Sequence, residues 1–320
     1  MPIGIFNAYQ AKFSYFSIRC KKYLDEKGIS MSIAGLTIIG ESINDSVPST
    51  HTLFEKNDIA GIVELAKSQA ESGAAYIDVN VGLRSPGFMA DIVKKIQEHI
   101  TLPLSIDTPD PEIAAAGLEA YKPERAGKRK PIINSISQAR LQMFDIYKKQ
   151  PFIPILLVTE GLDQSSDLKM NRTAEETHAT AKIMMNIARE HINNVKNSEV
   201  ILDPGIVPIG SDSEGNFKRL MNTIKLIHQD ADLKGVNMSV GLSNFTVMLP
   251  SKRADGSPVK GPLESAFLTM AMPMGFNTVI GSVKRNYSLL PEDNPAMQCL
   301  KDVLQSDGFD AIMRVMNFYS

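Results

Sequence analysis

The chain has 320 residues, of which 43% are hydrophobic and 22% are charged, and these proportions are ordinary for a globular protein. The formal net charge is −2, so the composition gives no reason to expect nucleic acid or an anionic membrane as a general partner. The two cysteines, Cys20 and Cys299, argue against a disulfide framework or a cysteine-rich zinc site and predict a reducing, cytoplasmic location. No apolar stretch reaches 18 residues, so no membrane-spanning helix is expected.

The first 30 residues are rich in aromatic side chains and lysine, and they contain no apolar stretch long enough for a secretory signal. Met31 stands just before the first apolar run, so this segment is either an extension or a mis-assigned start. We predict an extension of unknown role over residues 1–30 and a functional domain over residues 31–320.

Short apolar runs alternate with segments of helical periodicity through the rest of the chain. The runs cover residues 36–40, 75–79, 102–106, 131–134, 152–158, 200–202, 238–241 and 277–281. Helices are expected at 58–72, 87–99, 110–120, 138–149, 173–195, 214–229, 261–274, 294–304 and 307–317. Apolar strands separated by amphipathic helices indicate a parallel sheet covered on both faces. Eight βα units close a barrel, whereas an open doubly wound sheet normally carries a GxGxxG turn, which is absent here in that context. We predict one (β/α)8 TIM barrel.

Acid and amide side chains gather where the predicted strands end. The polar and small residues at these ends are Glu41, Asn44, Asp78, Asn80, Asp107, Asn134, Asp203, Gly241, Ser243, Asn244 and Ser282. The carboxyl ends of barrel strands meet at one opening, where barrel active sites are built. Because His51 falls in a loop and the other four histidines fall on helices, neither a metal site nor a Ser-His-Asp triad is expected.

Each of these residues has a purely structural interpretation, because Asp and Asn often cap helices or form turns. Asp110 is expected to be a helix cap, and of Asp78 and Asn80, which alternate along one strand, only one is expected to point into the barrel. However, buried acids and amides need hydrogen-bond partners, and caps alone do not explain so many at one opening. The pattern indicates a ligand with many donors and acceptors, such as a pterin, a purine or another heteroaromatic amide.

The strand-end motifs, taken in order, resemble those of the pterin-binding methyltransferases. This family includes methyltetrahydrofolate:corrinoid/iron–sulfur protein methyltransferase and the folate module of cobalamin-dependent methionine synthase. The motifs are IGESIN at 39–44, DVNVG at 78–82, SIDT at 105–108, INSIS at 133–137, LDPGI at 202–206, GLSN at 241–244 and FLTMAM at 267–272. Seven motifs in this order at barrel-consistent positions make the resemblance specific.

The resemblance implies roles for individual residues. Asp107, Asn134 and Asp203 would bind the pterin, Gly241 and Ser243 would line the same pocket, and Asn244 would lie near nitrogen 5 and act in catalysis. Additional pocket positions would be Glu41, Asn44, Asp78, Asn80 and Ser282. After GLSN the chain departs from the family pattern, so Lys252 and Arg253 would take over contacts to the glutamate tail of the folate.

The implied reaction moves a methyl group between nitrogen 5 of tetrahydrofolate and the cobalt of a corrinoid, with no metal bound by this chain. The sequence contains no D-x-H-x-x-G cobalamin-binding motif, so the corrinoid would be carried by a partner protein. Neither the direction of transfer nor the oligomeric state, with a homodimer among the options, follows from the sequence.

Two alternatives remain open at this point. Dihydropteroate synthase uses the same kind of barrel, and Lys284 and Arg285 after the last strand are compatible with its basic S-x-R motif, whereas its N-x-T-P-D-S-F loop is absent. A non-catalytic folate-binding barrel is the second alternative.

Overall fold

The computed structural model describes residues 33–163, 165 and 167–320. The expected extension at 1–30 lies outside the described residues. In the described part of the chain, no helix combines the length and the apolarity needed to cross a membrane.

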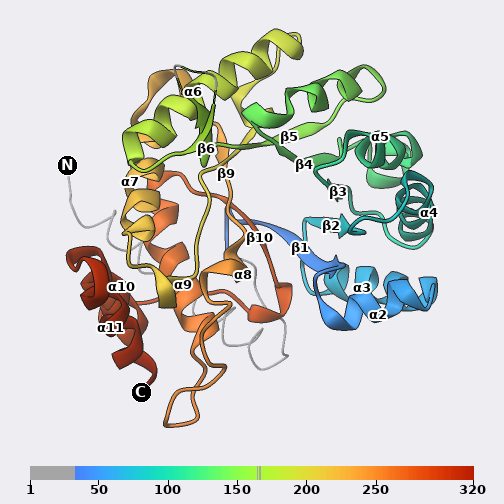
Figure 1. Cartoon of the computed structure of the whole chain (residues 1–320). Helices are drawn as coiled ribbons and strands as arrows, with labels where there is room; N and C mark the ends of the chain where they lie inside the picture. The colour runs from blue at the N-terminus through green and yellow to red at the C-terminus, as the bar shows by residue number, and fades with distance from the viewer. Residues whose placement is uncertain (1–32, 164, 166) are drawn as a thin grey trace, which may run out of the picture.

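Eight parallel strands form one sheet that curls into a nearly closed barrel (Figure 1). The strands are β1 (Thr37–Asn44), β2 (Tyr76–Asn80), β3 (Leu104–Asp107), β4 (Ile132–Ile136), β5 (Ile153–Leu157), β8 (Ile201–Asp203), β9 (Asn237–Met238) and β10 (Thr278–Gly281). Their order is β10-β1-β2-β3-β4-β5-β8-β9. The two outer strands meet just beyond β9, where Ile280 N donates to Val240 O at 3.0 Å and Gly241 pairs with Ile280. The predicted (β/α)8 TIM barrel is confirmed.

Helices surround the strands, and α10 and α11 pack outside α9 (Figure 1). The α-helices are α2 (Pro48–Glu55), α3 (Ile59–Glu71), α4 (Pro86–Gln97), α5 (Pro111–Ala120), α6 (Ala174–His191), α7 (Asn216–Gln229), α8 (Leu242–Phe245), α9 (Lys260–Ala271), α10 (Pro295–Gln305) and α11 (Gly308–Tyr319). The 3-10 helices are η1 (Pro123–Ala126), η2 (Gln138–Lys148), η3 (Asn197–Glu199), η4 (Ile209–Ser211), η5 (Ala231–Leu233), η6 (Met272–Met274) and η7 (Val283–Arg285). Asp110 caps α5, as predicted, because its side chain accepts from Glu112 N and Ile113 N.

The structure corrects the sequence interpretation in several places. His51, which is expected in a loop, lies on α2, a helix that the sequence interpretation did not include, and the short helix α8 was not expected either. The segment 138–149 is the 3-10 helix η2 rather than an α-helix, with a kink at Arg140. A two-stranded antiparallel hairpin, β6 (Glu160–Leu162) and β7 (Leu168–Met170), follows β5 where no element was expected. Strands of three residues are too short for a period-2 pattern to stand out from a loop.

A layer of five isoleucines fills the inside of the barrel. Ile39, Ile132, Ile155, Ile201 and Ile280 form one buried cluster, separate from the large core between the strands and the surrounding helices. We call this layer the floor. Side chains two residues apart on a strand share a face, so the next inward side chains stand above the floor. The opening above the floor, at the carboxyl ends of the strands, is called the mouth below.

Candidate functional site

Alternation along the strands directs most of the expected site residues into the mouth. On four strands, the residue two positions after the floor isoleucine is polar. These residues are Glu41, Asn134, Asp203 and Ser282. Tyr76 packs against the floor, so Asp78 and Asn80 share its face of β2. The apolar floor is therefore followed, towards the mouth, by a ring of acid, amide and hydroxyl side chains.

Three side chains from β2 and β3 form the centre of this ring. Asn80 Nδ2 donates to Asp107 Oδ2 at 2.9 Å, and Asp78 lies beside Asp107. Asn134 is the register partner of Asp107 on β4. The expectation that only one of Asp78 and Asn80 would point inward is wrong, because residues two apart on a strand face the same way.

Burial raises the pKa of both acids in this cluster. The pKa of Asp78, which is 1% exposed, is raised well above its usual range, first by burial and then by the neighbouring charge of Asp107. Burial also raises the pKa of Asp107, and the hydrogen bond from Asn80 partly offsets this effect. Two carboxyl groups this close resist simultaneous ionisation, because the charge on one raises the pKa of the other.

Asp78 also lacks a partner that a buried carboxyl normally has. Ser105 and Asn134 lie near it and lower its pKa, but neither oxygen of Asp78 meets a donor in hydrogen-bond geometry among the described residues. Leaving a buried polar group unpaired costs about 1–3 kcal/mol, and such groups often face a ligand. This side chain is therefore suited to a molecule that brings its own donors.

Asp203 occupies the opposite strand of the ring and is 8% exposed. Its Oδ1 accepts from Gly205 N at 2.8 Å, and Gly205 adopts a positive φ of 70° in the turn that follows. Burial raises the pKa of Asp203 to about 7. No hydrogen bond within the described residues joins Asp203 to the Asp78–Asp107 pair. Asp203 and the pair therefore offer separate contact points to a ligand.

The residues after β9 form the rim on the side of β1. Ser243 Oγ donates to Glu41 Oε1, and burial raises the pKa of Glu41 while the guanidinium of Arg285 lowers it. Asn244 is exposed on the short helix α8, and within the described chain its side chain makes no hydrogen bond. An ideal Cβ on residue 241 would come within 2.9 Å of Asn244 Nδ2, so Gly241 leaves the amide its space.

Three expected residues are placed outside this ring of contacts. Asn44 Oδ1 accepts from Ser46 N at 2.9 Å and so forms a local turn. Arg253 lies with its guanidinium 4.7 Å from the ring centre of Phe318 on α11, and Lys252 beside it is exposed. Neither basic side chain contacts the acids of the mouth in the described structure.

Sequence reasoning missed one group beside the mouth. Glu264 on α9 is fully buried, with Oε1 accepting from Thr246 Oγ1 at 2.5 Å and Oε2 lying 3.2 Å from Arg285 Nε. From the sequence, Arg285 is only a basic residue after the last strand. A single glutamate within an apolar helix leaves no local motif, so no sequence signal could have singled out Glu264.

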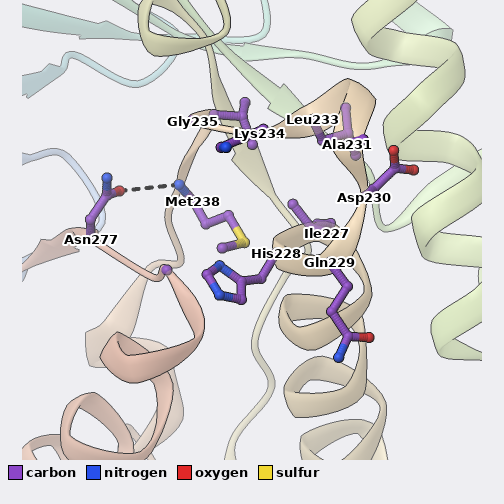
Figure 2. A pocket seen from close by; sticks show the side chains of 12 residues that line it. Ile227, His228, Gln229, Asp230, Ala231, Leu233, Lys234, Gly235, Met238 and Asn277 are labelled. Carbon is purple, nitrogen blue, oxygen red and sulfur yellow. Dashed lines mark hydrogen bonds between the residues drawn. The ribbon is translucent and has the colours of Figure 1, made fainter.

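A cavity of about 600 Å³ lies at the other end of the barrel (Figure 2). It is lined by the end of α7, including His228, and by residues that precede or begin β9 and β10, such as Gly235 and Asn277. Asn277 Oδ1 accepts from Met238 N at 3.2 Å, which ties the two strand starts together. None of the expected site residues lines this cavity, so it is distinct from the mouth.

The arrangement in the mouth is suited to hydrogen bonding and proton exchange. Its acids have raised pKa values, so they offer both O–H donors and acceptor oxygens, and Asn80, Asn134 and Asn244 add carboxamides. In residues 33–163, 165 and 167–320, no group of three or more His, Cys, Asp or Glu side chains could hold a metal ion.

Comparisons with known proteins agree with this geometry. The family described as "Pterin binding enzyme" matches residues 43–281. A methylcorrinoid:tetrahydrofolate methyltransferase from Eubacterium limosum is 29% identical over 259 residues, which cover 77% of this chain and 84% of that protein.

Solved structures of low sequence identity share the fold. The 7,8-dihydropteroate synthase from Vibrio fischeri matches with a TM-score of 0.55 and 13% identity, covering 80% of this chain and 92% of that chain. Dihydropteroate synthase from Thermus thermophilus matches with a TM-score of 0.54 and 15% identity, covering 80% of this chain and 91% of that chain. The match to the family extends from β1 to the end of β10, and this chain therefore belongs to the pterin-binding enzymes.

Proposed function

We propose that residues 31–320 transfer a methyl group from the cobalt of a methylcorrinoid, carried by a separate protein, to nitrogen 5 of tetrahydrofolate. The observation that carries the proposal is the buried Asp78, whose two oxygens lack partners above an apolar floor and beside other acids and amides. The similarity to the Eubacterium limosum enzyme supports both the reaction and its direction.

A pterin ring fits the donors and acceptors of the mouth. Its amino group and adjacent ring N–H form a donor pair that one carboxylate can accept, and its other nitrogens and carbonyl match carboxamides. Asp78, Asp107, Asn134 and Asp203 are our candidates for these contacts, and Asn80 supports Asp107 by donating to its Oδ2. A ring without these donors would leave buried acids unpaired, which gives the site its selectivity.

The chemical step needs alignment more than covalent help from the chain. The lone pair of nitrogen 5 attacks the methyl carbon, the carbon–cobalt bond breaks with its electron pair left on the corrinoid, and the proton of nitrogen 5 leaves. We assign Asn244 to the stabilisation of nitrogen 5, because a carboxamide can accept a hydrogen bond before transfer and donate one afterwards. Holding the two reactants in line supplies most of the remaining rate.

The rim of the mouth is compatible with a protein as the methyl donor. Seven of the eleven exposed large apolar side chains of the described chain lie on segments that leave the carboxyl ends of barrel strands, so they concentrate at the mouth end. They are Val47, Leu83, Leu162, Leu168, Met170, Val247 and Met248. Exposed apolar groups gathered around a site commonly mark a protein interface. We infer that the corrinoid protein docks on this rim.

A methyl-transfer assay tests the proposal directly. The full chain is mixed with methylcobalamin and tetrahydrofolate, and methyltetrahydrofolate formation is followed together with the loss of the methylcobalamin absorbance. Enzyme-dependent transfer is expected, and binding of tetrahydrofolate without transfer to or from any corrinoid would instead favour a non-catalytic folate-binding barrel.

The same preparation tests dihydropteroate synthase activity. A dihydropterin pyrophosphate and p-aminobenzoate are supplied in place of the methyl donor and tetrahydrofolate. We expect no dihydropteroate, and its formation in the absence of methyl transfer would overturn the proposed function.

A further inference from the structure

Glu264 is an acid that the barrel buries completely, and its two oxygens meet two different loops. Oε1 accepts the hydroxyl of Thr246 at 2.5 Å, and Oε2 lies 3.2 Å from Arg285 Nε. Thr246 is the C-cap residue directly after α8, and Arg285 ends the 3-10 helix η7 that follows β10. One side chain on α9 thus links the loops after β9 and β10, which stand side by side at the mouth.

The link continues to the other end of α8. Arg285 lies close enough to Glu41 to lower its pKa, and Glu41 accepts a hydrogen bond from Ser243. Ser243 and Thr246 are three residues apart and flank Asn244, so both sides of this turn are attached to an acid. Lys260 Nζ adds a third attachment by donating to Val247 O at 3.2 Å.

Stability alone does not account for a carboxylate at this position. Burying a charge costs several kcal/mol, and a well-packed apolar side chain of similar volume is often equally or more stabilising than a buried ion pair. Leu242 and Phe245 anchor the α8 turn through burial, and the ring of Phe245 packs 5.3 Å from that of Phe217. These apolar contacts hold the backbone of the turn but do not orient the exposed Asn244 amide, whose side chain has no hydrogen bond among the described residues. Glu264 adds a directional contact, because it accepts a hydrogen bond from Thr246 while the ion pair with Arg285 holds the carboxylate itself.

We propose that Glu264 is a positioning residue that holds the α8 turn, through Thr246 and Arg285, so that the Asn244 amide faces nitrogen 5 of the folate. This inference rests on the proposed function, since it assigns a purpose to the geometry of Asn244. It also gives Arg285 a role within the protein, because its guanidinium is engaged by Glu264.

Four variants test the proposal. Thr246→Val removes the hydroxyl at nearly constant volume, Thr246→Ser restores it, and Glu264→Gln removes the charge that faces Arg285. Thr223→Val is the matched control, because Thr223 is also fully buried and its hydroxyl bonds only to the Arg219 carbonyl within α7. Tetrahydrofolate affinity, thermal stability and the single-turnover rate of transfer from methylcobalamin are measured for each.

We expect Thr246→Val and Glu264→Gln to slow transfer by about tenfold to a hundredfold, the loss associated with a displacement of about 1 Å in a reacting group. Their tetrahydrofolate dissociation constants should change less than about threefold, since pterin recognition lies on other strands. Thr246→Ser and Thr223→Val should transfer at the wild-type rate. Equal rates for Thr246→Val and Thr223→Val would overturn the proposal, whereas an inactive wild-type protein would overturn the proposed function instead.

A second readout does not depend on activity. The side-chain amide signals of Asn244 are assigned in a two-dimensional nitrogen–proton spectrum by their absence in Asn244→Ala. These signals should shift in Thr246→Val and Glu264→Gln and stay in place in Thr246→Ser and Thr223→Val. Signals that stay in place in all four variants would show that Glu264 does not orient Asn244.

Discussion

Gly241 and Asn244 are fitted to each other: a Cβ added at position 241 would come within 2.9 Å of Asn244 Nδ2. A contact this short would force one of the two groups to move, and the end of a flexible side chain moves more easily than the backbone of a barrel strand end. Position 241 is also where the chain pairs with Ile280 to close the barrel. The absence of a side chain at Gly241 therefore allows the Asn244 amide to occupy its present position.

Gly241→Ala should impair transfer while leaving the fold largely intact. The added methyl group displaces the Asn244 amide, so the transfer rate is expected to fall about tenfold to a hundredfold. The melting temperature should change by only a few degrees, because the displaced group is exposed. A wild-type transfer rate in this variant would mean that the amide does not need its present position.

Asn244→Ala should slow transfer more than it weakens folate binding. A hydrogen bond that strengthens as charge develops is worth about 2.7–4 kcal/mol in comparable sites, which corresponds to a rate loss of about 10²–10³. Single-turnover kinetics separate this loss from the dissociation constant of tetrahydrofolate. If both quantities change by the same small factor, Asn244 contributes binding alone.

Asp107→Ala should weaken tetrahydrofolate binding by about 1–3 kcal/mol or more, because a buried donor loses its acceptor. The change removes a candidate pterin contact and also leaves Asn80 Nδ2 without the acceptor that now lies at 2.9 Å. Calorimetric titration of the variant measures the loss. Asp107→Asn keeps the shape and is expected to lose less, and an affinity near the wild-type value in Asp107→Ala would contradict the pterin position proposed for β3.

Asp203→Asn should make the protein more stable at pH 8 and flatten its pH dependence. Burial raises the pKa of Asp203 from 3.8 to about 7, so the folded state holds this proton more tightly than the unfolded chain does. Stability is then greatest below pH 4 for this group and falls as the pH rises from about 4 to 7, by up to about 4 kcal/mol in total. Asparagine stays neutral and keeps an oxygen for Gly205 N.

Urea denaturation from pH 4 to 8 measures the difference between the Asp203→Asn variant and the wild type. The two should converge at pH 4 and diverge above it, and parallel curves over this range would show that Asp203 titrates normally. The same variant is expected to bind tetrahydrofolate less tightly, since an acceptor oxygen is replaced by an amide donor.

Met248→Asp should distinguish the two kinds of methyl donor. Met248 is 68% exposed on the rim beyond α8, so an aspartate there leaves the fold undisturbed and adds a charge to the proposed docking surface. Transfer from a protein-bound methylcorrinoid is expected to fall about tenfold or more, while transfer from free methylcobalamin is unchanged. Met316→Asp on α11, where the methionine is also exposed, serves as the control. Equal losses with both donors would remove Met248 from the interface.

Much of the architecture was accessible from the sequence because each βα unit carries its own periodicity. The eight apolar runs correspond to the eight barrel strands, with β1 longer than its run and β9 starting one residue earlier, and the barrel then brings their carboxyl ends together. The convergence of Asp107, Asn134 and Glu41 around the mouth follows from this topology. The hairpin of β6 and β7 did not follow, since its two strands have three residues each.

The details of the site depended on contacts between distant segments. The bond between Asn80 and Asp107 spans 27 residues and that between Ser243 and Glu41 spans 202, and neither separation leaves a local pattern. Arg253 is expected to contact the glutamate tail because the chain departs from the family pattern after GLSN, yet its guanidinium lies 4.7 Å from the ring centre of Phe318. The strand-end motifs thus predict which residues lie near the mouth, whereas the hydrogen-bond partner of each side chain depends on the packing of distant segments.

The isoleucine floor closes the interior of the barrel on one side, so the proposed site opens only at the mouth. In the proposed reaction, the pterin has to arrive through the same opening over which the bulky methyl donor settles. A donor seated first would seal the pocket against folate, so productive turnover requires the small reactant to load before the large one and to depart after it. Excess donor protein would then inhibit its own reaction, and this substrate inhibition would follow from the closed floor of the barrel.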